Sequence, residues 1–164
     1  MAINRGKDFE KVIKEAFEKV PDVSIDRIHD QTNGYAGSTN ICDFIVYKRP
    51  YQYYVECKSV HGNTLPFNNI TDRQWKGMLE KSKIFGVQAG VICWWIDKDV
   101  TLFIPIQALQ SLKTILPQSK SVRYDMERVH GIIEIPGKKK RVFFDYDMEP
   151  FFKEPIWKEK VWQL

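Results

Sequence analysis

Cysteine is scarce in this chain, with Cys42, Cys57 and Cys93 as the three examples among 164 residues. An odd number of cysteines inside apolar runs argues against a disulfide framework and favours reduced thiols in a reducing compartment. Histidine is equally scarce, and the three histidines have no zinc-ligand spacing with the cysteines. The sequence therefore gives no indication of a structural zinc site.

Long apolar runs are also missing. No stretch is long enough to span a bilayer, and the first residues, MAINRGKDFEK, lack the apolar core of a signal peptide. We therefore expect a cytoplasmic protein with no membrane partner. The chain also lacks internal repeats, low-complexity segments and linkers, which predicts a single domain over 1–164, with a core at about 4–147 and an aromatic tail at 148–164.

What is present is ordinary for a globular protein: 43% hydrophobic and 28% charged residues. A net charge of +4 and a pI near 8.9 are compatible with a polyanionic partner such as nucleic acid, but do not require one. Hydrophobic periodicity and turn signals predict helices alternating with strands, in an α/β or α+β sheet with helical cover. The predicted helices lie over 7–20, from 71 to a stop at Gly86, and from Pro105 onward. The predicted strands lie over 23–29, 41–47, 51–58, 87–96 and 100–104. A hairpin is predicted from 131–136 and 141–146, with its tip at 137–140.

Aromatic residues are expected mainly in the core. Trp94 and Trp95 are neighbours in an apolar strand, so they should pack on opposite faces of the sheet rather than stack on bases. The tail beyond Met148 carries aromatic residues that either cover the sheet of this chain or contact a partner subunit.

The stretch from Ile41 to Val60 carries the most informative pattern. Two β-branched and aromatic runs flank Lys48-Arg49-Pro50, which predicts a β-hairpin. Because side chains alternate with period two, Glu56 and Lys58 share one face, and Asp43 joins them if the strands pair in the register that the pattern favours. Three ionisable groups thus meet on a mostly apolar face.

Two interpretations of this group remain open. Two carboxylates and a backbone carbonyl suit Mg²⁺, and a neighbouring lysine can orient a water or stabilise charge on a phosphate. Alternatively, the three side chains form a cross-strand salt bridge on a solvated face. The alternation, which aims all three groups at one face, favours the metal site.

Two further polar residues are candidates. Projecting the helix over 7–20 at about 100° per residue places Glu10 at the edge of its apolar stripe. The alternative is a solvated carboxylate near the helix N-terminus, where the helix dipole favours it. Gln74 is the fourth residue of Thr71-Asp72-Arg73-Gln74, which matches a capping box and so has a structural explanation of its own.

These residues carry a resemblance to known proteins. Asp43, followed by Glu56-Cys57-Lys58 on a hairpin, resembles the PD-(D/E)xK nuclease core of restriction enzymes and resolvases, and the ordered set over 4–96 resembles the RecU family of Holliday junction resolvases. The residues that carry the second resemblance are Asn4-Arg5-Gly6, Glu10, Ser38-Thr39, Asp43, Glu56, Lys58, Leu65-Pro66-Phe67-x-Asn69-Ile70, Gln74 and the apolar strand at 90–96.

The resemblance implies a restriction endonuclease-like α/β fold, a mixed sheet flanked by helices, with a defined active site. Asp43, Glu56 and the backbone carbonyl of Cys57 would bind Mg²⁺ or Mn²⁺. Lys58 would act on the attacking water, and Glu10 would reach the metal from the first helix, directly or through water. The activity implied is that of a homodimer that resolves four-way DNA junctions by paired symmetric nicks in recombination or repair.

The resemblance also implies DNA contacts. Gln74 would support the lysine or a phosphate. Arg5, Ser38 and Thr39 would contact the DNA backbone, although a solvated arginine and a turn explain them equally well. A separate basic group, expected at a hairpin tip, is a further candidate for phosphate contact or simply a solvated turn. Its members are Lys138, Lys139, Lys140 and Arg141.

One departure from the RecU family concerns substrate choice. Those proteins insert a long stalk before the metal aspartate, whereas only Asp30 to Asn40 is available here, and Ile41 and Cys42 replace polar residues. Nuclease chemistry is compatible with these differences. Without the stalk, however, the resemblance does not by itself imply selectivity for junctions. The alternatives are a restriction-type or repair endonuclease on duplex or other branched DNA, or an inactive nuclease fold that binds DNA.

Overall fold

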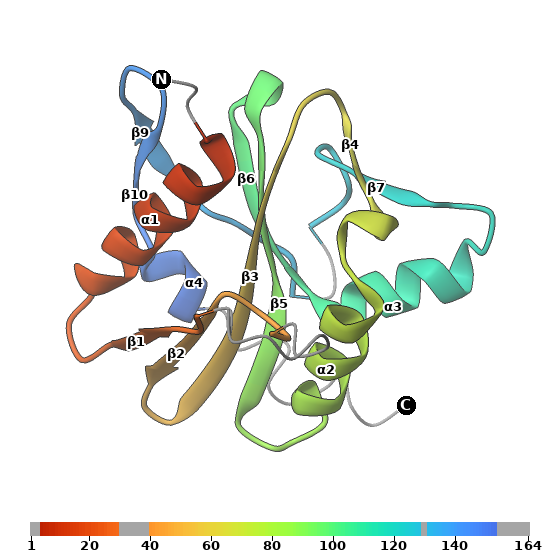
Figure 1. Cartoon of the computed structure of the whole chain (residues 1–164), viewed down its shortest axis with the longest axis horizontal. Helices are drawn as coiled ribbons and strands as arrows, with labels where there is room; N and C mark the ends of the chain where they lie inside the picture. Colours follow the sequence, from red (N-terminus) through yellow and green to blue (C-terminus); the bar gives the residue numbers. More distant parts are fainter. Residues whose placement is uncertain (1–3, 30–39, 129–130, 154–164) are drawn as a thin grey trace, which may run out of the picture.

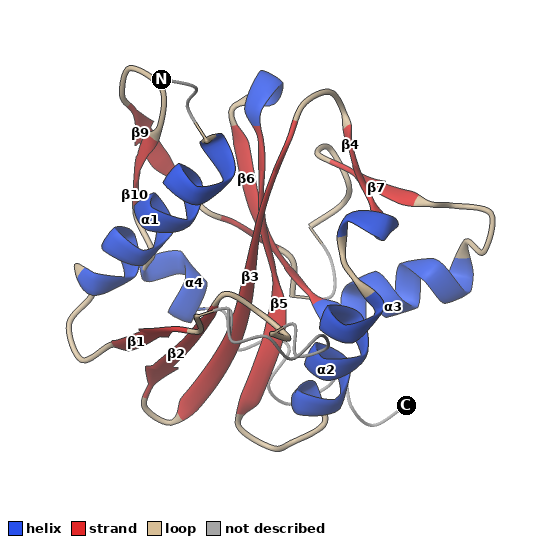
Figure 2. Ribbon diagram, viewed as in Figure 1, coloured by secondary structure: helices blue, strands red, loops and turns tan. Residues whose placement is uncertain are grey.

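A six-stranded mixed sheet forms the centre of the molecule (Figure 2). The computed structural model describes residues 4–29, 40–128 and 131–153. The strands lie in the order β1-β2-β3-β5-β6-β8, with β3 and β5 parallel and the other neighbours antiparallel. Their bounds are β1 Ser24–Arg27, β2 Phe44–Lys48, β3 Tyr51–Val60, β5 Val87–Trp95, β6 Val100–Pro105 and β8 Ile133–Glu134.

Helices cover both faces of this sheet (Figure 1). On one side of β3, β5 and β6 lie α1 Arg5–Glu18, α4 Glu149–Lys153 and the pair β9 Gly137–Lys139 and β10 Phe144–Tyr146. On the other side lie α2 Asp72–Ser82, α3 Ile106–Ile115 and the pair β4 Thr64–Pro66 and β7 Ser121–Arg123, with the short 3₁₀ turns η1 Phe67–Asn69 and η2 Ile96–Lys98 in the connections. The mixed α/β class predicted from the sequence is therefore confirmed.

Each face of the sheet has its own apolar cluster, because strand side chains alternate between the faces. Phe9, Ile13 and Phe17 of α1 pack with Trp94 on one face. Trp95 packs on the other face, in the cluster that holds the apolar sides of α2 and α3. Both tryptophans are fully buried, so the prediction that they fill the core from opposite faces is confirmed.

The C-terminal aromatic residues fall partly within the described chain. Phe151 of α4 is buried against Phe17, Tyr53 and Phe103, and Phe152 packs beside it. These two residues cover the sheet of this chain. The remaining aromatic residues of the tail lie outside the described residues. Across the described part of the chain, none of the helices combines the length and the apolar character that crossing a membrane requires.

The predicted hairpin of 131–136 and 141–146 is wrong. Ile133 pairs with Phe103 of β6, and the amide of Ile135 donates to the carbonyl of Thr101 at 2.9 Å. Since β6 uses the hydrogen bonds of this segment and buries its isoleucines, the segment extends the main sheet. The hairpin forms instead between β9 and β10, with the turn at 140–143, so Lys138 and Lys139 lie in a strand and not at a tip.

Two other boundaries differ from the predictions. Helix α2 ends at Ser82, four residues before Gly86, and Gly86 takes a positive φ of 79° in the turn that leads into β5. The connection between β3 and α2, for which the sequence predicts no element, contains β4 and η1, because β4 pairs with β7 in another region without a predicted element. A three-residue strand has too little alternation to be recognised before its partner is known.

Candidate metal centre

Asp43 stands at the point where the hairpin of β2 and β3 stops pairing. Phe44 of β2 lies opposite Val55, and the amide of Asp43 donates to the carbonyl of Val55 at 3.1 Å. Its Oδ2 accepts from the amide of Cys57 at 2.7 Å, in the place of a backbone carbonyl. Beyond this contact no other described strand pairs with β3 on that edge, up to its end at Val60.

The backbone of Cys57 faces this open edge. Its amide donates to Asp43, and the N–H and C=O of one strand residue project to the same side of the strand. The carbonyl of Cys57 therefore points toward the edge on which Asp43 lies. This is the orientation that a carbonyl ligand of a metal at this edge requires.

Glu56 contributes a buried carboxylate next to Asp43. The residue is 3% exposed, and its Oε1 accepts from Nζ of Lys58 at 2.7 Å and from Nε2 of Gln74 at 2.8 Å. Its Oε2 is fully buried, and no donor within the described part of the chain reaches it. A buried carboxylate oxygen without a donor is costly unless a proton or a cation occupies the position beside it.

The carboxylates of Asp43 and Glu56 are close enough to share a proton. Burial and the charge of Asp43 together raise the pKa of Glu56 to about 7, against the opposing effect of Lys58. Burial also raises the pKa of Asp43, against the amide of Cys57 and the charge of Lys58. Two buried carboxylates repel each other when both are ionised. A divalent cation can replace the proton that they would otherwise share, so the pair suits such a cation.

The donor set present is two carboxylates and one backbone carbonyl. Among the residues that the structure describes, no three His, Cys, Asp or Glu side chains gather closely enough to hold a metal ion by themselves. Mg²⁺ is commonly bound by one or two carboxylates and keeps several waters, so this set fits Mg²⁺ or Mn²⁺ without a third acidic side chain.

Glu10 lies beside the pair rather than within it. Its Oε2 forms an ion pair with Arg27 of β1 at 2.7 Å, and its side chain is 18% exposed. Burial and then the charge of Asp43 raise its pKa, while Arg27 and Lys58 lower it. Glu10 thus shares an electrostatic environment with the site. A contact to the metal through water remains a prediction.

Gln74 forms the predicted capping box and also contacts Glu56, a contact that the sequence did not predict, while support of Lys58 or of a phosphate remains a prediction. Its Oε1 accepts from the amide of Thr71 at 3.0 Å, and the hydroxyl of Thr71 accepts from the amide of Gln74, which completes the capping box at the start of α2. Its Nε2 donates to Glu56. The helix cap therefore fixes the orientation of the amide that holds Glu56.

Helix α2 also positions the segment before Asp43. A Cβ at Gly77 would lie 2.3 Å from Cγ2 of Ile41, so only glycine permits this close approach. We expect Gly77→Ala to displace Ile41 and weaken the binding of Mg²⁺ at this site, despite the gain of up to about 1 kcal/mol in helix propensity. The Mg²⁺ affinity, measured by calorimetric titration, should recover in the double variant Gly77→Ala/Ile41→Ala, which removes the clashing side chain. Equal Mg²⁺ affinity of Gly77→Ala and the native protein would contradict this positioning role.

The raised pKa of Glu56 predicts how the metal-free protein responds to pH. Its folded pKa of about 7 exceeds the ordinary 4.5, so its contribution to stability is complete below about pH 4.5 and is lost as pH rises through 7. The loss is on the order of 3 kcal/mol. Urea unfolding in EDTA between pH 5 and pH 8 should therefore show a falling free energy of unfolding, and Mg²⁺ should restore it most at high pH. A flat profile in EDTA would contradict the shared proton.

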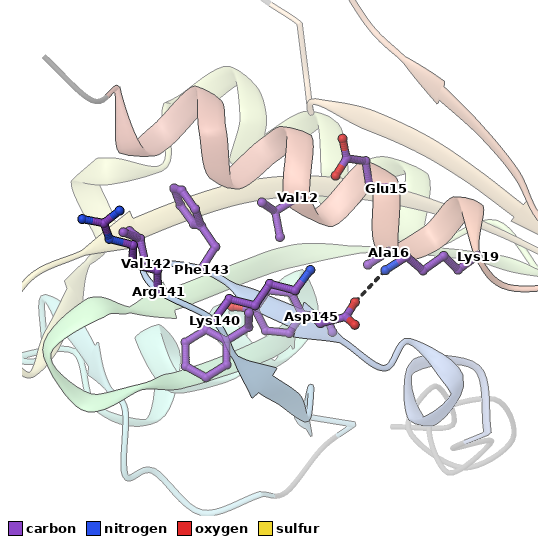
Figure 3. Close-up of a pocket in the computed structure, with 11 residues that line it drawn as sticks. Val12, Glu15, Ala16, Lys19, Lys140, Arg141, Val142, Phe143 and Asp145 are labelled. Atoms are coloured by element: carbon purple, nitrogen blue, oxygen red, sulfur yellow. Dashed lines mark hydrogen bonds and ion pairs between the residues drawn. The ribbon is translucent and has the colours of Figure 1, made fainter. Parts of the chain in front are cut away.

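The predicted DNA-contacting residues are scattered. Arg5 opens α1 and contacts His61, 3.3 Å from its Nε2. Ser38 and Thr39 lie outside the described residues. Of the basic group, Lys139 pairs with Asp99 at 2.6 Å, and Lys138 is exposed on β9. Lys140 and Arg141 lie over a cavity of about 380 Å³ between α1 and the turn before β10, where Lys19 and Asp145 form an ion pair at 2.6 Å (Figure 3).

Sequence reasoning missed Arg27, His61 and Asp97. Arg27 lies opposite Phe44 in the register of β1 and β2, next to Asp43, so an explicit pairing of the strand at 23–29 with the hairpin would have found it. His61 and Asp97 follow two strands that pair in parallel, β3 and β5, but no local signal indicates that their side chains meet.

Comparison with known proteins finds similarity in structure but not in sequence. No family model matches the chain, and no curated protein sequence matches it either. Among solved structures, the chain is similar to Hjc, a Holliday junction resolvase from the archaeal hyperthermophile Archaeoglobus fulgidus. The TM-score is 0.47 at 18% sequence identity, and the match covers 62% of this chain and 78% of that one.

Proposed function

We propose that this protein is a metal-dependent DNA endonuclease that resolves four-way junctions by paired symmetric nicks, in DNA recombination or repair. The observation that carries the proposal is the pair of adjacent carboxylates of Asp43 and Glu56, with a buried oxygen that no described donor reaches and with Lys58 beside them. A solvated salt bridge would expose the carboxylate of Glu56, whereas the Glu56 residue is only 3% exposed.

Each residue of the site has a defined part in this proposal. Asp43, Glu56 and the carbonyl of Cys57 would hold Mg²⁺ or Mn²⁺. Such an ion, when bound, supplies a Lewis acid for the scissile phosphate and lowers the pKa of water. Lys58 donates to Glu56 and is partly exposed, so its ammonium group can also orient the attacking water or stabilise charge on phosphorus. Glu10 would contact the metal through a bound water.

The substrate is the part of the proposal that depends on the resemblance. A net charge of +4 suits a polyanion, and the ordered motifs over 4–96 resemble junction resolvases. Paired nicks require two active sites, so a homodimer belongs to the same proposal. Of the segment that stands in place of a stalk, Asp30 to Asn40, residues 30–39 lie outside the described residues.

Cleavage assays test the proposal directly. The protein is incubated with labelled four-way junction, flap and linear duplex of matched sequence, in Mg²⁺, in Mn²⁺ and in EDTA. We expect symmetric nicks in the junction that require metal, and a dimer by light scattering. Equal cleavage of all three substrates would favour a restriction-type or repair nuclease and overturn the resolvase assignment. Binding without cleavage of any substrate would indicate an inactive DNA-binding fold.

A further inference from the structure

Near the end of β3, three side chains outside the metal site are linked in series by hydrogen bonds. Arg5 Nη1 lies 3.3 Å from Nε2 of His61, and Nδ1 of His61 lies 3.1 Å from Oδ1 of Asp97. Arg5 comes from the first turn of α1, His61 follows β3 and Asp97 lies in η2, directly after β5. The ends of the parallel strands β3 and β5 and the start of α1 lie together at the top of Figure 1.

The contacts fix the proton on His61. A guanidinium has donors and no acceptor, so Nε2 of His61 must accept from Arg5. The carboxylate of Asp97 accepts only, so Nδ1 of His61 carries the proton and donates to it. The neutral Nδ1–H tautomer is the form that satisfies both contacts. His61 therefore links a carboxylate to an arginine and does not compete with the arginine for the carboxylate.

A backbone hydrogen bond holds Asp97 in this arrangement. The other oxygen of Asp97 accepts from the amide of Gly62 at 2.6 Å, and Gly62 has a φ of 75°, which favours glycine. Asp97 thus ties the loop after β3 to the loop after β5. The hydrogen bonds to Gly62 and to His61 both lower its pKa, so it stays ionised as an acceptor.

We propose that His61 and Asp97 position Arg5 to bind a backbone phosphate next to the scissile one. The inference rests on the proposed nuclease function and deepens it. Arg5 uses one of its five N–H donors on His61, which leaves a planar set of donors for a phosphate. His61 directly follows β3, three residues or roughly 10 Å beyond Lys58, a separation that one DNA strand bound at the metal site could span to meet Arg5.

Arg5 would contact the DNA directly, whereas His61 and Asp97 would act only by positioning Arg5. The test depends on this difference. Affinity for a labelled four-way junction is measured in Ca²⁺, over a range of salt concentrations. Arg5→Ala should weaken binding about tenfold, the size expected of a charge-assisted hydrogen bond, and reduce the salt slope by about 0.9. His61→Ala should weaken binding by a smaller factor.

A double-mutant cycle separates positioning from a general structural role. We expect His61→Ala to have no further effect on affinity in the Arg5→Ala background. His61→Gln should restore most of the affinity, because its amide offers an acceptor to Arg5 and a donor to Asp97. Lys11→Ala, on the exposed side of α1, is the control for a general loss of positive charge.

Two results would overturn the inference. One is an unchanged affinity and salt slope for Arg5→Ala in a protein whose native form binds the junction. The other is an additive effect of His61→Ala in the Arg5→Ala background with an unchanged melting temperature, which would show that His61 contacts DNA by itself. Failure of the native protein to bind or cleave any DNA would instead overturn the proposed function, so the two failures are distinguishable.

Discussion

Glu56→Gln should abolish DNA cleavage and, at the same time, stabilise the metal-free protein. The substitution removes the charge of a proposed metal ligand, so cleavage should fall by more than about 10³-fold. It also replaces a buried oxygen that no described donor reaches with an amide that can donate to Asp43. Oε1 remains as the acceptor for Lys58 and Gln74. We expect a gain of about 1–3 kcal/mol in the free energy of unfolding in EDTA.

Thermal unfolding in EDTA and in Mg²⁺ measures both sides of this prediction. In EDTA the melting temperature of Glu56→Gln should exceed that of the native protein by several degrees, at about 2–4 °C per kcal/mol. In Mg²⁺ the native protein should gain stability by ligand binding, and the variant should not. Glu80→Gln, on the exposed side of α2, is the matched control and should change neither quantity.

A loss of stability in Glu56→Gln under EDTA would contradict the interpretation of the site. It would mean that the ionised carboxylate is already satisfied in the metal-free fold, as in an ordinary ion pair with Lys58. The two outcomes differ in sign, so the measurement does not depend on the accuracy of the predicted magnitude. A carboxylate that is needed for activity but lowers the stability of the metal-free fold is an example of the usual trade-off between stability and activity.

Much of the site could be predicted because a strand has a strict period. Once the hairpin is recognised, alternation alone sends Glu56 and Lys58 to one face, and the apolar pattern fixes the register opposite Asp43. The same logic correctly placed Trp94 and Trp95 on opposite faces of the sheet. Local patterns of this kind determine a structure without any knowledge of distant segments.

The rest depended on pairing between distant segments. The isoleucines of 131–135 fit a hairpin as well as they fit an extension of β6, and their burial against the sheet decides between the two. The contact of His61 with Arg5 joins residues 56 positions apart, and no local pattern encodes it. Gln74 shows a third limit, because the sequence presented its helix cap and a role at the site as alternatives, whereas one amide group completes the cap and donates to Glu56.

Lys58→Met should reduce the rate of DNA cleavage by about 10²–10³-fold, the loss expected when one preorganised donor is removed from an active site. Methionine keeps much of the apolar length of the side chain, so the fold should persist. Single-turnover cleavage at saturating enzyme measures the chemical step separately from binding. Lys11→Met replaces an exposed lysine of α1, serves as the control and should cleave at the native rate.

The metal and pH dependence of the Lys58→Met defect identifies what the lysine does. Lys58 lowers the pKa of Glu56, so its removal raises that pKa and weakens metal binding at a given pH. If this were its main role, high pH and high Mg²⁺ would restore the native rate. We expect the rate to remain low at saturating Mg²⁺ and pH 8.5, because the ammonium group is also needed on the attacking water or the phosphate. Full recovery under these conditions would reduce Lys58 to an electrostatic support of Glu56, and native activity of Lys58→Met at pH 7 would remove it from the site.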